Sequence, residues 1–320
     1  MYYIGVDIGG MSIKTGIVNE KGEIIAKEAF KTLSISPSEQ MKKVSDTVNN
    51  LLEKTGIKRT EIKGIGVGCP GAINGVKGIV SYSANLKWHD FNLKSELEKF
   101  SGLTVRVGND ADAATLGEFM FGAAKGYSDV VMLTVGTGIG GGIIINKKLY
   151  EGSRGMAAEL GHTVLILGGL PCGCGRRGCF EQYASATALI RQTKEAMFDN
   201  PRSLMWKVCE NDVNKINGIT AFAAAKLGDE TANRVVYKYV AYLSEGILDY
   251  CNVFRPELFI IGGGISKEGD YLINKIENYL NEQNFGYYGS PVSKVVTASL
   301  KNDAGIIGAA SLIAENKTEN

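Results

Sequence analysis

Apolar residues near the start of the chain alternate in a way that predicts a β-meander. Strands are expected at residues 3–8, 12–18 and 23–30, the last two joined by a turn at 19–22. Residues 38–54 then carry apolar side chains at helical spacing, and a strand over 63–68 follows. The first part of the chain is therefore predicted to be a meander followed by α/β alternation.

A strand, a glycine loop and a second strand recur in the middle of the chain. A strand over 129–135 runs into TGIGGG and then into a strand over 143–146. Glycine loops of this kind present clustered backbone N–H groups to an anion, so two of them suit the two ends of a triphosphate. We therefore expect two lobes. The remaining elements are expected at 110–124, 186–197, 221–227, 232–252, 258–261 and 271–283, with a last helix from about 304.

Composition favours a cytoplasmic enzyme acting on a small molecule. The 320 residues are 44% hydrophobic and 22% charged, which is ordinary for a soluble protein of about two domains. Lysine plus arginine number 35 against 34 acidic residues, so no overall field attracts nucleic acid or an anionic membrane. The first residues lack a basic segment, and Asp7 interrupts their apolar run far short of a membrane span. We expect neither nucleic acid nor membrane as a partner.

The cysteines predict a structural zinc site in segment 162–179. Cys172, Cys174 and Cys179 fall within eight residues, and His162 precedes them. In a reducing compartment such a cluster indicates a metal rather than disulfides, and one imidazole with three thiolates makes a closed tetrahedral zinc set. Four protein ligands leave no position for a reactive water. The alternative is three unrelated thiols near a surface histidine.

Two glutamates flank the expected zinc ligands. Glu159 lies three residues before His162, and Glu181 lies two residues after Cys179. Carboxylates accept hydrogen bonds from sugar hydroxyls, so a metal-pinned loop that ends in both of them suits a polyol. Either glutamate could instead be solvated surface.

The first glycine loop carries an acid and a nearby lysine. Asp7 ends the first strand ahead of Gly9 and Gly10, and Lys14 lies on the next strand. A carboxylate beside bare backbone suits Mg²⁺ or its waters next to phosphate. An ordinary tight turn is the alternative.

The second glycine loop superficially matches a dinucleotide fingerprint. That motif requires a helix after its glycines, whereas this loop continues into Ile143 and a strand. Thr137 and Gly138 are better explained as a second phosphate loop. The run 262–264, which follows a strand, could pass close to a nucleoside, or it could be a flexible turn.

Asn109 and Asp110 lie where a strand over 104–107 gives way to a helix. Asp110 could be a helix N-cap, a common structural use of aspartate. It could also be a general base, since a carboxylate within reach of a sugar hydroxyl accepts its proton as the oxygen attacks a γ-phosphate. Both interpretations stay open from this segment alone.

Together these motifs resemble the ROK family (repressors, open reading frames and kinases), and within it the bacterial glucokinases. The resemblance runs from DIGG through Pro70-Gly71, Asn109-Asp110, TGIGGG, Glu159-x-Gly161-His162 and the cysteine cluster to IIGGGIS. It implies an α/β chain with the two-lobed, actin-like ATPase fold, also called the sugar kinase or ribonuclease H-like fold. The lobes would be residues 1–120 and 121–303, with a C-terminal helix at about 304–316 packed back on the first.

By that resemblance the protein is an ATP:hexose 6-phosphotransferase that uses ATP and Mg²⁺, contains structural zinc and forms a homodimer. Asp110 resembles the catalytic base that acts on the 6-hydroxyl, and His162 serves both zinc and sugar. The sugar-side positions are Gly71, Asn85, Asn109, Asp110, Glu159, His162 and Glu181. The nucleotide-side positions are Asp7, Gly9, Gly10, Lys14, Thr137, Gly138 and Gly263.

Glucose is the expected sugar, and two alternatives stay open. A kinase for fructose, mannose, allose or N-acetylmannosamine could use the same pocket with small changes around it. A sugar-sensing repressor shares the zinc segment, but it would carry an N-terminal DNA-binding domain, whereas the first strand is expected at Tyr3. One position departs from the family: Met11 stands where threonine usually follows DIGG, so a hydroxyl that could touch phosphate is missing.

Overall fold

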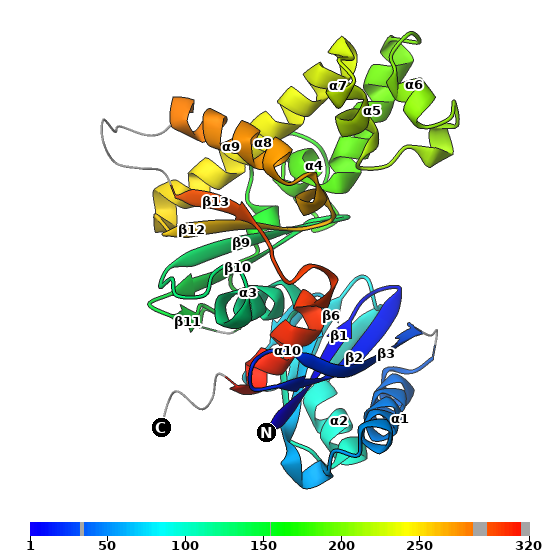
Figure 1. The fold of residues 1–320 in the computed structure, drawn as a ribbon, viewed down its shortest axis with the longest axis vertical. Coiled ribbons are helices and arrows are strands. Elements are labelled where there is room, and N and C mark those ends of the chain that lie inside the picture. The colour runs from blue at the N-terminus through cyan, green and yellow to red at the C-terminus, as the bar shows by residue number, and fades with distance from the viewer. Residues whose placement is uncertain (33–34, 154, 284–292, 315–320) are drawn as a thin grey trace. The chain divides into compact units, whose positions relative to one another are not determined.

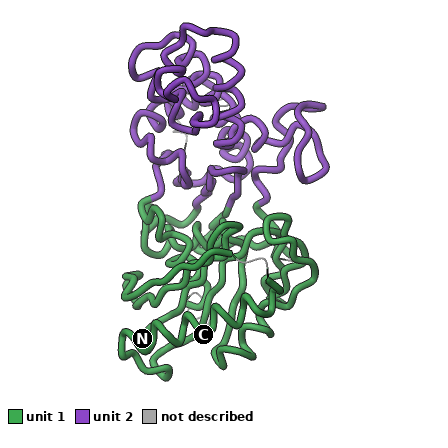
Figure 2. The backbone as a smooth tube through the Cα atoms, turned by 90° about the vertical axis from the view of Figure 1, so that its right-hand side faces the viewer, with its two compact units in different colours: residues 1–129, 142–158, 299–320 green, residues 130–141, 159–298 purple. Residues whose placement is uncertain are grey.

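A computed structural model describes residues 1–32, 35–153, 155–283 and 293–314. The chain folds into two compact units (Figure 2). Unit 1 comprises Met1–Asp129, Gly142–Ala158 and Ser299–Asn320, and unit 2 comprises Val130–Gly141 and Glu159–Ala298. The lobes predicted from the sequence, residues 1–120 and 121–303, do not have the same bounds as these compact units. They stay a prediction.

Unit 1 is built on a five-stranded mixed sheet of order β3-β2-β1-β4-β8. The N-terminal strands form the predicted antiparallel meander, while β1, β4 and β8 run parallel. The strands are β1 (Tyr2–Ile8), β2 (Ser12–Asn19), β3 (Ile24–Lys31), β4 (Ile62–Cys69) and β8 (Val105–Asn109). Because parallel strands end at one edge, the carboxyl ends of β1 and β8 deliver Asp7 and Asn109 to the same edge.

Helices cover both faces of this sheet (Figure 1). On one face, Ile4, Val6 and Ile8 pack in a buried core with apolar residues of α1 (Pro37–Thr55) and α2 (Leu93–Ser101). On the other, Tyr3 and Val18 pack with α10 (Ala304–Ala314), which also packs on α3 (Asp110–Phe121). Successive side chains of a strand point to opposite faces of the sheet, so neighbouring residues of β1 belong to different cores. Residues 315–316 of the predicted last helix lie outside the described residues.

Glycines let α10 approach the sheet at backbone distance. A Cβ atom at Gly5 of β1 would lie 1.9 Å from the Ile306 carbonyl oxygen, and one at Gly66 of β4 would lie 1.7 Å from that of Ala309. Any larger side chain would force the helix away, so these two glycines fix how closely α10 lies on the sheet.

A small antiparallel sheet in unit 1 is absent from the sequence-based assignment. It contains β5 (Ala72–Asn74), β6 (Ile79–Ser83) and β7 (Trp88–Phe91) in that order, and Asn85 lies between the last two strands. The strands are short, and Lys87 and Asp90 adopt positive φ angles of 57° and 46°. Such brief segments carry too few alternating positions to be detected as strands.

The second five-stranded sheet has the order β11-β10-β9-β12-β13, with β12 parallel to both neighbours. Its strands are β9 (Val130–Val135), β10 (Ile139–Ile145), β11 (Lys148–Leu149), β12 (Leu258–Gly263) and β13 (Lys294–Thr297). The glycines of TGIGGG were expected in a loop before residue 143, but β10 already begins at Ile139. A Cβ at Gly142 would lie 2.2 Å from Thr115 Oγ1, so this glycine serves close packing within a strand.

Unit 2 is mainly helical beyond its strands. The helices predicted at 186–197, 221–227, 232–252 and 271–283 are confirmed as α5 (Ala186–Asp199), α7 (Thr220–Lys226), α8 (Glu230–Phe254) and α9 (Asp270–Gln283). Five short helical elements of unit 2 were not predicted from the sequence: α4 (Glu181–Ala184), α6 (Met205–Val208), η2 (Leu160–His162), η3 (Val213–Lys215) and η4 (Gly264–Glu268). Two more such elements lie in unit 1: η1 (Arg59–Glu61) and η5 (Lys301–Asp303). None of the described helices is long and apolar enough to cross a membrane.

Candidate functional site

A cluster of four metal-ligating side chains lies in unit 2. The ligand atoms of His162, Cys172, Cys174 and Cys179 all lie within 4.8 Å of one another. Cys174 and Cys179 Sγ are 3.6 Å apart, and Cys172 Sγ is 3.7 Å from His162 Nδ1. Zinc–sulfur bonds of about 2.3 Å place two sulfurs at tetrahedral corners about 3.8 Å apart. The donor set and its spacing therefore fit one tetrahedral metal ion, as the sequence predicted.

Local backbone pairing brings these ligands together. Isolated β-bridges join Val164 to Cys179 and Pro171 to Arg177, and the Cys172 N–H donates to the Arg176 carbonyl at 2.9 Å. The second bridge lies inside the first, so the segment between the histidine and the last cysteine folds back on itself as one irregular hairpin. Partial burial raises the pKa of the Cys172 thiol to about 12, so a bound cation is needed to keep it as a thiolate near neutral pH.

Glu181 joins the metal cluster to the second glycine loop. Its Oε1 accepts from Cys172 Sγ at 3.0 Å and lies 3.8 Å from His162 Nδ1. Its Oε2 accepts from the Ile139 N–H at 3.4 Å, and a Cβ at Gly138 would lie 2.6 Å from the same oxygen. One carboxylate therefore connects predicted sugar, metal and nucleotide residues within unit 2.

Glu159 belongs to the same neighbourhood. It keeps contact with solvent, yet partial desolvation raises the pKa of its carboxyl group, as does the Glu181 carboxylate, while His162 acts in the opposite direction. Glu159 therefore senses the charges of His162 and Glu181, and the use of these three residues as a pocket for hydroxyl groups stays a prediction.

In unit 1, Asp110 opens α3 directly after β8. The N-cap is Asn109, whose Oδ1 accepts from the Ala111 N–H at 2.8 Å and the Asp112 N–H at 3.4 Å. The N-cap interpretation of Asp110 is therefore wrong by one residue: Asp110 is the first helical residue, and its Oδ1 accepts from the Ala111 N–H at 3.0 Å. Its side chain remains exposed, as a general base requires.

Other predicted sugar residues lie near Asp110. Asn109 Nδ2 donates to the Gly71 carbonyl at 3.2 Å, and Asn109 pairs in register with Cys69. Burial raises the pKa of the Cys69 thiol far above its ordinary value, and the Asp110 carboxylate raises it further. Cys69 is thus an inert neighbour of the Asp110 carboxylate. Unit 1 gathers Gly71, Asn109 and Asp110, whereas Asn85 lies against Gly10, whose added Cβ would be 3.7 Å from that of Asn85.

The first glycine loop is hydrogen-bonded on both sides. Asp7 and Lys14 are cross-strand partners, with Lys14 Nζ donating to Asp7 Oδ2 at 2.9 Å. The Gly9 N–H donates to the Ser12 carbonyl, and Thr32 Oγ1 donates to the Gly9 carbonyl at 2.6 Å. The N–H of Gly9 is therefore turned toward its own loop rather than toward an anion. Sequence reasoning missed Thr32, because only the pairing of β2 with β3 brings it to this loop.

Of the residues of unit 2 that were predicted to contact the nucleotide, Thr137 is exposed and Gly263 ends β12. Gly263 has φ of +80°, and its added Cβ would lie 2.2 Å from the Val135 carbonyl oxygen. Neighbouring Gly264 differs, since a Cβ there meets nothing within 4 Å.

Gly263→Ala is expected to lower the free energy of unfolding by about 1–3 kcal/mol, because the new side chain meets backbone in a strained conformation. Gly264→Ala is the matched control, with an expected change within about 0.5 kcal/mol. Urea unfolding of both variants checks this. Equal stability of the two variants would show that Gly263 is not fixed by packing.

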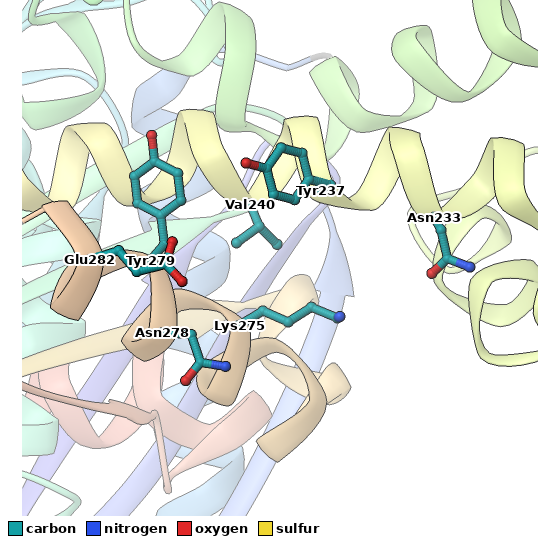
Figure 3. A pocket seen from close by; sticks show the side chains of 7 residues that line it. All are labelled: Asn233, Tyr237, Val240, Lys275, Asn278, Tyr279 and Glu282. Carbon is teal, nitrogen blue, oxygen red and sulfur yellow. The ribbon is translucent and has the colours of Figure 1, made fainter.

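Two surface pockets of unit 2 lie apart from these residues. One, of about 190 Å³, lies between α8 and α9 and includes Tyr237, Lys275 and Glu282 (Figure 3). The other, of about 300 Å³, lies between α5 and α8 and includes Gln192 and Arg234. No residue predicted for sugar, nucleotide or metal lines either pocket.

Comparison with known proteins decides the family. A model of the ROK family matches residues 3–316. The chain is 37% identical over 314 residues to a glucokinase of Streptomyces coelicolor, covering 98% of this chain and 97% of that protein. The chain belongs to the ROK family. This agrees with the motifs from which the resemblance was drawn.

Solved structures and regulators of the ROK family are also similar. A ROK glucokinase from Streptomyces griseus, solved in complex with glucose and AMPPNP, has a TM-score of 0.84 and 35% identity, covering 98% of this chain and all of that one. The xylose repressor of Caldicellulosiruptor bescii is 32% identical over 318 residues, which is 97% of this chain and 77% of the repressor. The α/β, two-lobed actin-like ATPase fold expected from the sequence is confirmed.

Proposed function

We propose that this protein is an ATP-dependent glucokinase that transfers the γ-phosphate of ATP to the 6-hydroxyl of glucose. The observation that carries the proposal is similarity over nearly the whole chain to glucokinases, one of them solved with glucose and an ATP analogue. The exposed Asp110 carboxylate beside Asn109 and Gly71 supplies the base that this chemistry requires.

In this mechanism Asp110 accepts the proton of the 6-hydroxyl as that oxygen attacks the γ-phosphorus. The new O–P bond forms while the bond between the γ-phosphorus and the ADP oxygen breaks, so ADP leaves with the electron pair. Asn109 holds the start of α3 to the Gly71 carbonyl and thus fixes the backbone that carries the base. Sugar hydroxyls are bound by Gly71, Asn85, Asn109, Glu159, His162 and Glu181.

Zinc is the metal proposed for His162, Cys172, Cys174 and Cys179, since three thiolates and one imidazole are a borderline-soft, closed set. When bound, it supplies a structural cross-link and no reactive water. Ligation would fix His162, and the Glu181 carboxylate, which contacts Cys172 and the Ile139 N–H, would then keep one position relative to the second glycine loop.

The nucleotide side is proposed to include Asp7, Gly9, Gly10, Lys14, Thr137, Gly138 and Gly263, although the Gly9 N–H is bonded to the Ser12 carbonyl and is not the donor to phosphate. Asp7 fits Mg²⁺, because its carboxylate offers hard oxygen ligands. The Asp7 side chain is 20% exposed, so it can hold the ion through water. When bound there, Mg²⁺ would neutralise phosphate charge; Lys14 orients the Asp7 carboxylate and adds a positive charge.

Met11→Thr is expected to lower the KM for ATP about two- to tenfold, the effect of one added hydrogen bond to phosphate. The Met11 side chain is 89% exposed, so its replacement removes little packing. Met11→Leu, which adds no hydroxyl, is the control and should leave the KM unchanged. Steady-state kinetics with varied ATP measures this, and equal KM values in all three proteins would remove any role for this position.

Product analysis tests the proposed function. The protein is incubated with Mg²⁺, ATP and glucose, and ³¹P NMR follows the appearance of glucose 6-phosphate together with ADP. Phosphate on another hydroxyl would contradict the assignment of Asp110 to the 6-hydroxyl. Absence of any sugar phosphate would favour a sugar-sensing protein, the class represented by the xylose repressor. A homodimeric state and a cytoplasmic location stay predictions from the sequence.

A further inference from the structure

The first turn of α10 lies directly against the Asp7 carboxylate. A Cβ atom at Gly305 would lie 2.6 Å from both Asp7 Cγ and Asp7 Oδ2, and 3.1 Å from Asp7 Cβ. Non-bonded carbon and oxygen atoms do not approach that closely, so no side chain other than hydrogen fits at residue 305 while Asp7 keeps its position.

Gly305 lies close to Asp7 because α10 packs close to the face of the sheet that β1 presents to it. Tyr3, Gly5 and Asp7 alternate along β1 and face α10, because neighbouring Ile4, Val6 and Ile8 pack in the opposite core. Gly5 admits the backbone of α10 at the Ile306 carbonyl, so the helix lies too near the sheet to leave room at Asp7.

Asp7 is confined from a second direction. Lys14 Nζ donates to Asp7 Oδ2 at 2.9 Å from the neighbouring strand. The same oxygen is the one nearest to position 305. The carboxylate can therefore move away from an added methyl group only if Lys14 Nζ moves with it or their hydrogen bond lengthens.

We propose that Gly305 is a positioning residue of the nucleotide site, which holds the Asp7 carboxylate in place by presenting bare helix backbone to it. The proposal rests on the proposed function in one respect, the assignment of Asp7 to MgATP. The partial positive charge at the start of α10 also favours a carboxylate at this point. Gly305 acts on the nucleotide only through Asp7 and touches no substrate.

Gly305→Ala is the test, with two readouts on the full chain. The variant is expected to bind Mg²⁺·AMPPNP at least about tenfold more weakly by calorimetry, because the carboxylate is displaced. Its affinity for glucose should change less than about twofold, since unit 1 places Gly305 beside Asp7 rather than Asp110. Its melting temperature should fall by about 2–4 °C.

A double-mutant cycle with Asp7→Ala separates this role from a general packing defect. With the carboxylate removed, Gly305→Ala should leave the melting temperature unchanged or raise it, because alanine is the better helix former. Gly308→Ala is the matched control in the same helix: its Cβ would lie 2.0 Å from the Ala113 carbonyl, so its destabilisation should persist in the Asp7→Ala background.

Any of three results would overturn the proposal. The first is unchanged Mg²⁺·AMPPNP affinity in Gly305→Ala, the second is an equal loss of melting temperature in both backgrounds, and the third concerns Asp7 itself. If Asp7→Ala itself binds Mg²⁺·AMPPNP normally, Asp7 has no nucleotide role and Gly305 cannot serve one. None of these results depends on whether glucose is the sugar, so glucokinase activity is judged separately.

Discussion

Asp110→Asn is expected to lower kcat for glucose phosphorylation by about 10²- to 10⁴-fold, while the Kd for glucose changes less than about threefold. The amide keeps the shape of the side chain and can still hydrogen-bond the 6-hydroxyl, but it cannot accept the proton. Asn109 rather than Asp110 supplies the N-cap of α3, so the substitution leaves the helix start intact. Steady-state kinetics and calorimetry with glucose measure the two quantities.

Asp46→Asn is the control for the loss of one negative charge. This aspartate is exposed on α1 in the same unit, and its replacement should leave both kcat and the Kd for glucose unchanged. Turnover in Asp110→Asn comparable to that of the unchanged protein would show that the base lies elsewhere. A large loss of glucose affinity without a loss of kcat would make Asp110 a binding residue only.

Removal of one metal ligand has the second large expected effect. Cys172→Ser should lose bound zinc, measured by mass spectrometry of the purified protein, and raise the KM for glucose about 10- to 100-fold. Cys172 contacts both the predicted ligand His162 and the Glu181 carboxylate, so its loss releases two predicted sugar residues at once. The affinity for AMPPNP should be largely retained.

Cys209→Ser is the matched control, because Cys209 is also buried in unit 2 but is not part of the four-residue cluster. It should keep both the metal and the KM for glucose. Full glucose affinity in a metal-free Cys172→Ser protein would contradict a supporting role for zinc. Loss of AMPPNP affinity in parallel would show that Glu181, through Ile139, couples the cluster to the nucleotide side.

Long, periodic elements could be predicted from the sequence, and short ones could not. The β1–β3 meander, α1 and α8 each contain enough alternating or helically spaced apolar residues to fix their type. The β5–β7 sheet has strands of three to five residues, too short for an alternating pattern to be detected. The glycines of β10 were predicted to lie in a loop, because the sequence around a glycine does not distinguish a strand from a loop.

The candidate site shows a similar division. The clustering of His162 with the three cysteines could be predicted, because metal-ligating chemistry requires those residue types at close spacing. The sequence could not show that Asn109 is the N-cap of α3 and Asp110 its first residue, since both residue types cap helices equally well. The approach of Gly305 to Asp7 joins residues almost 300 positions apart, and only the register of α10 on β1 produces it.

The sugar specificity is measured by a coupled ADP-release assay with Mg²⁺ and ATP across hexoses, amino sugars and N-acetyl sugars. We expect glucose to give the highest kcat/KM. A clear preference for fructose, mannose, allose or N-acetylmannosamine would contradict the assignment of glucose while keeping the mechanism. No turnover with any sugar would contradict the kinase itself.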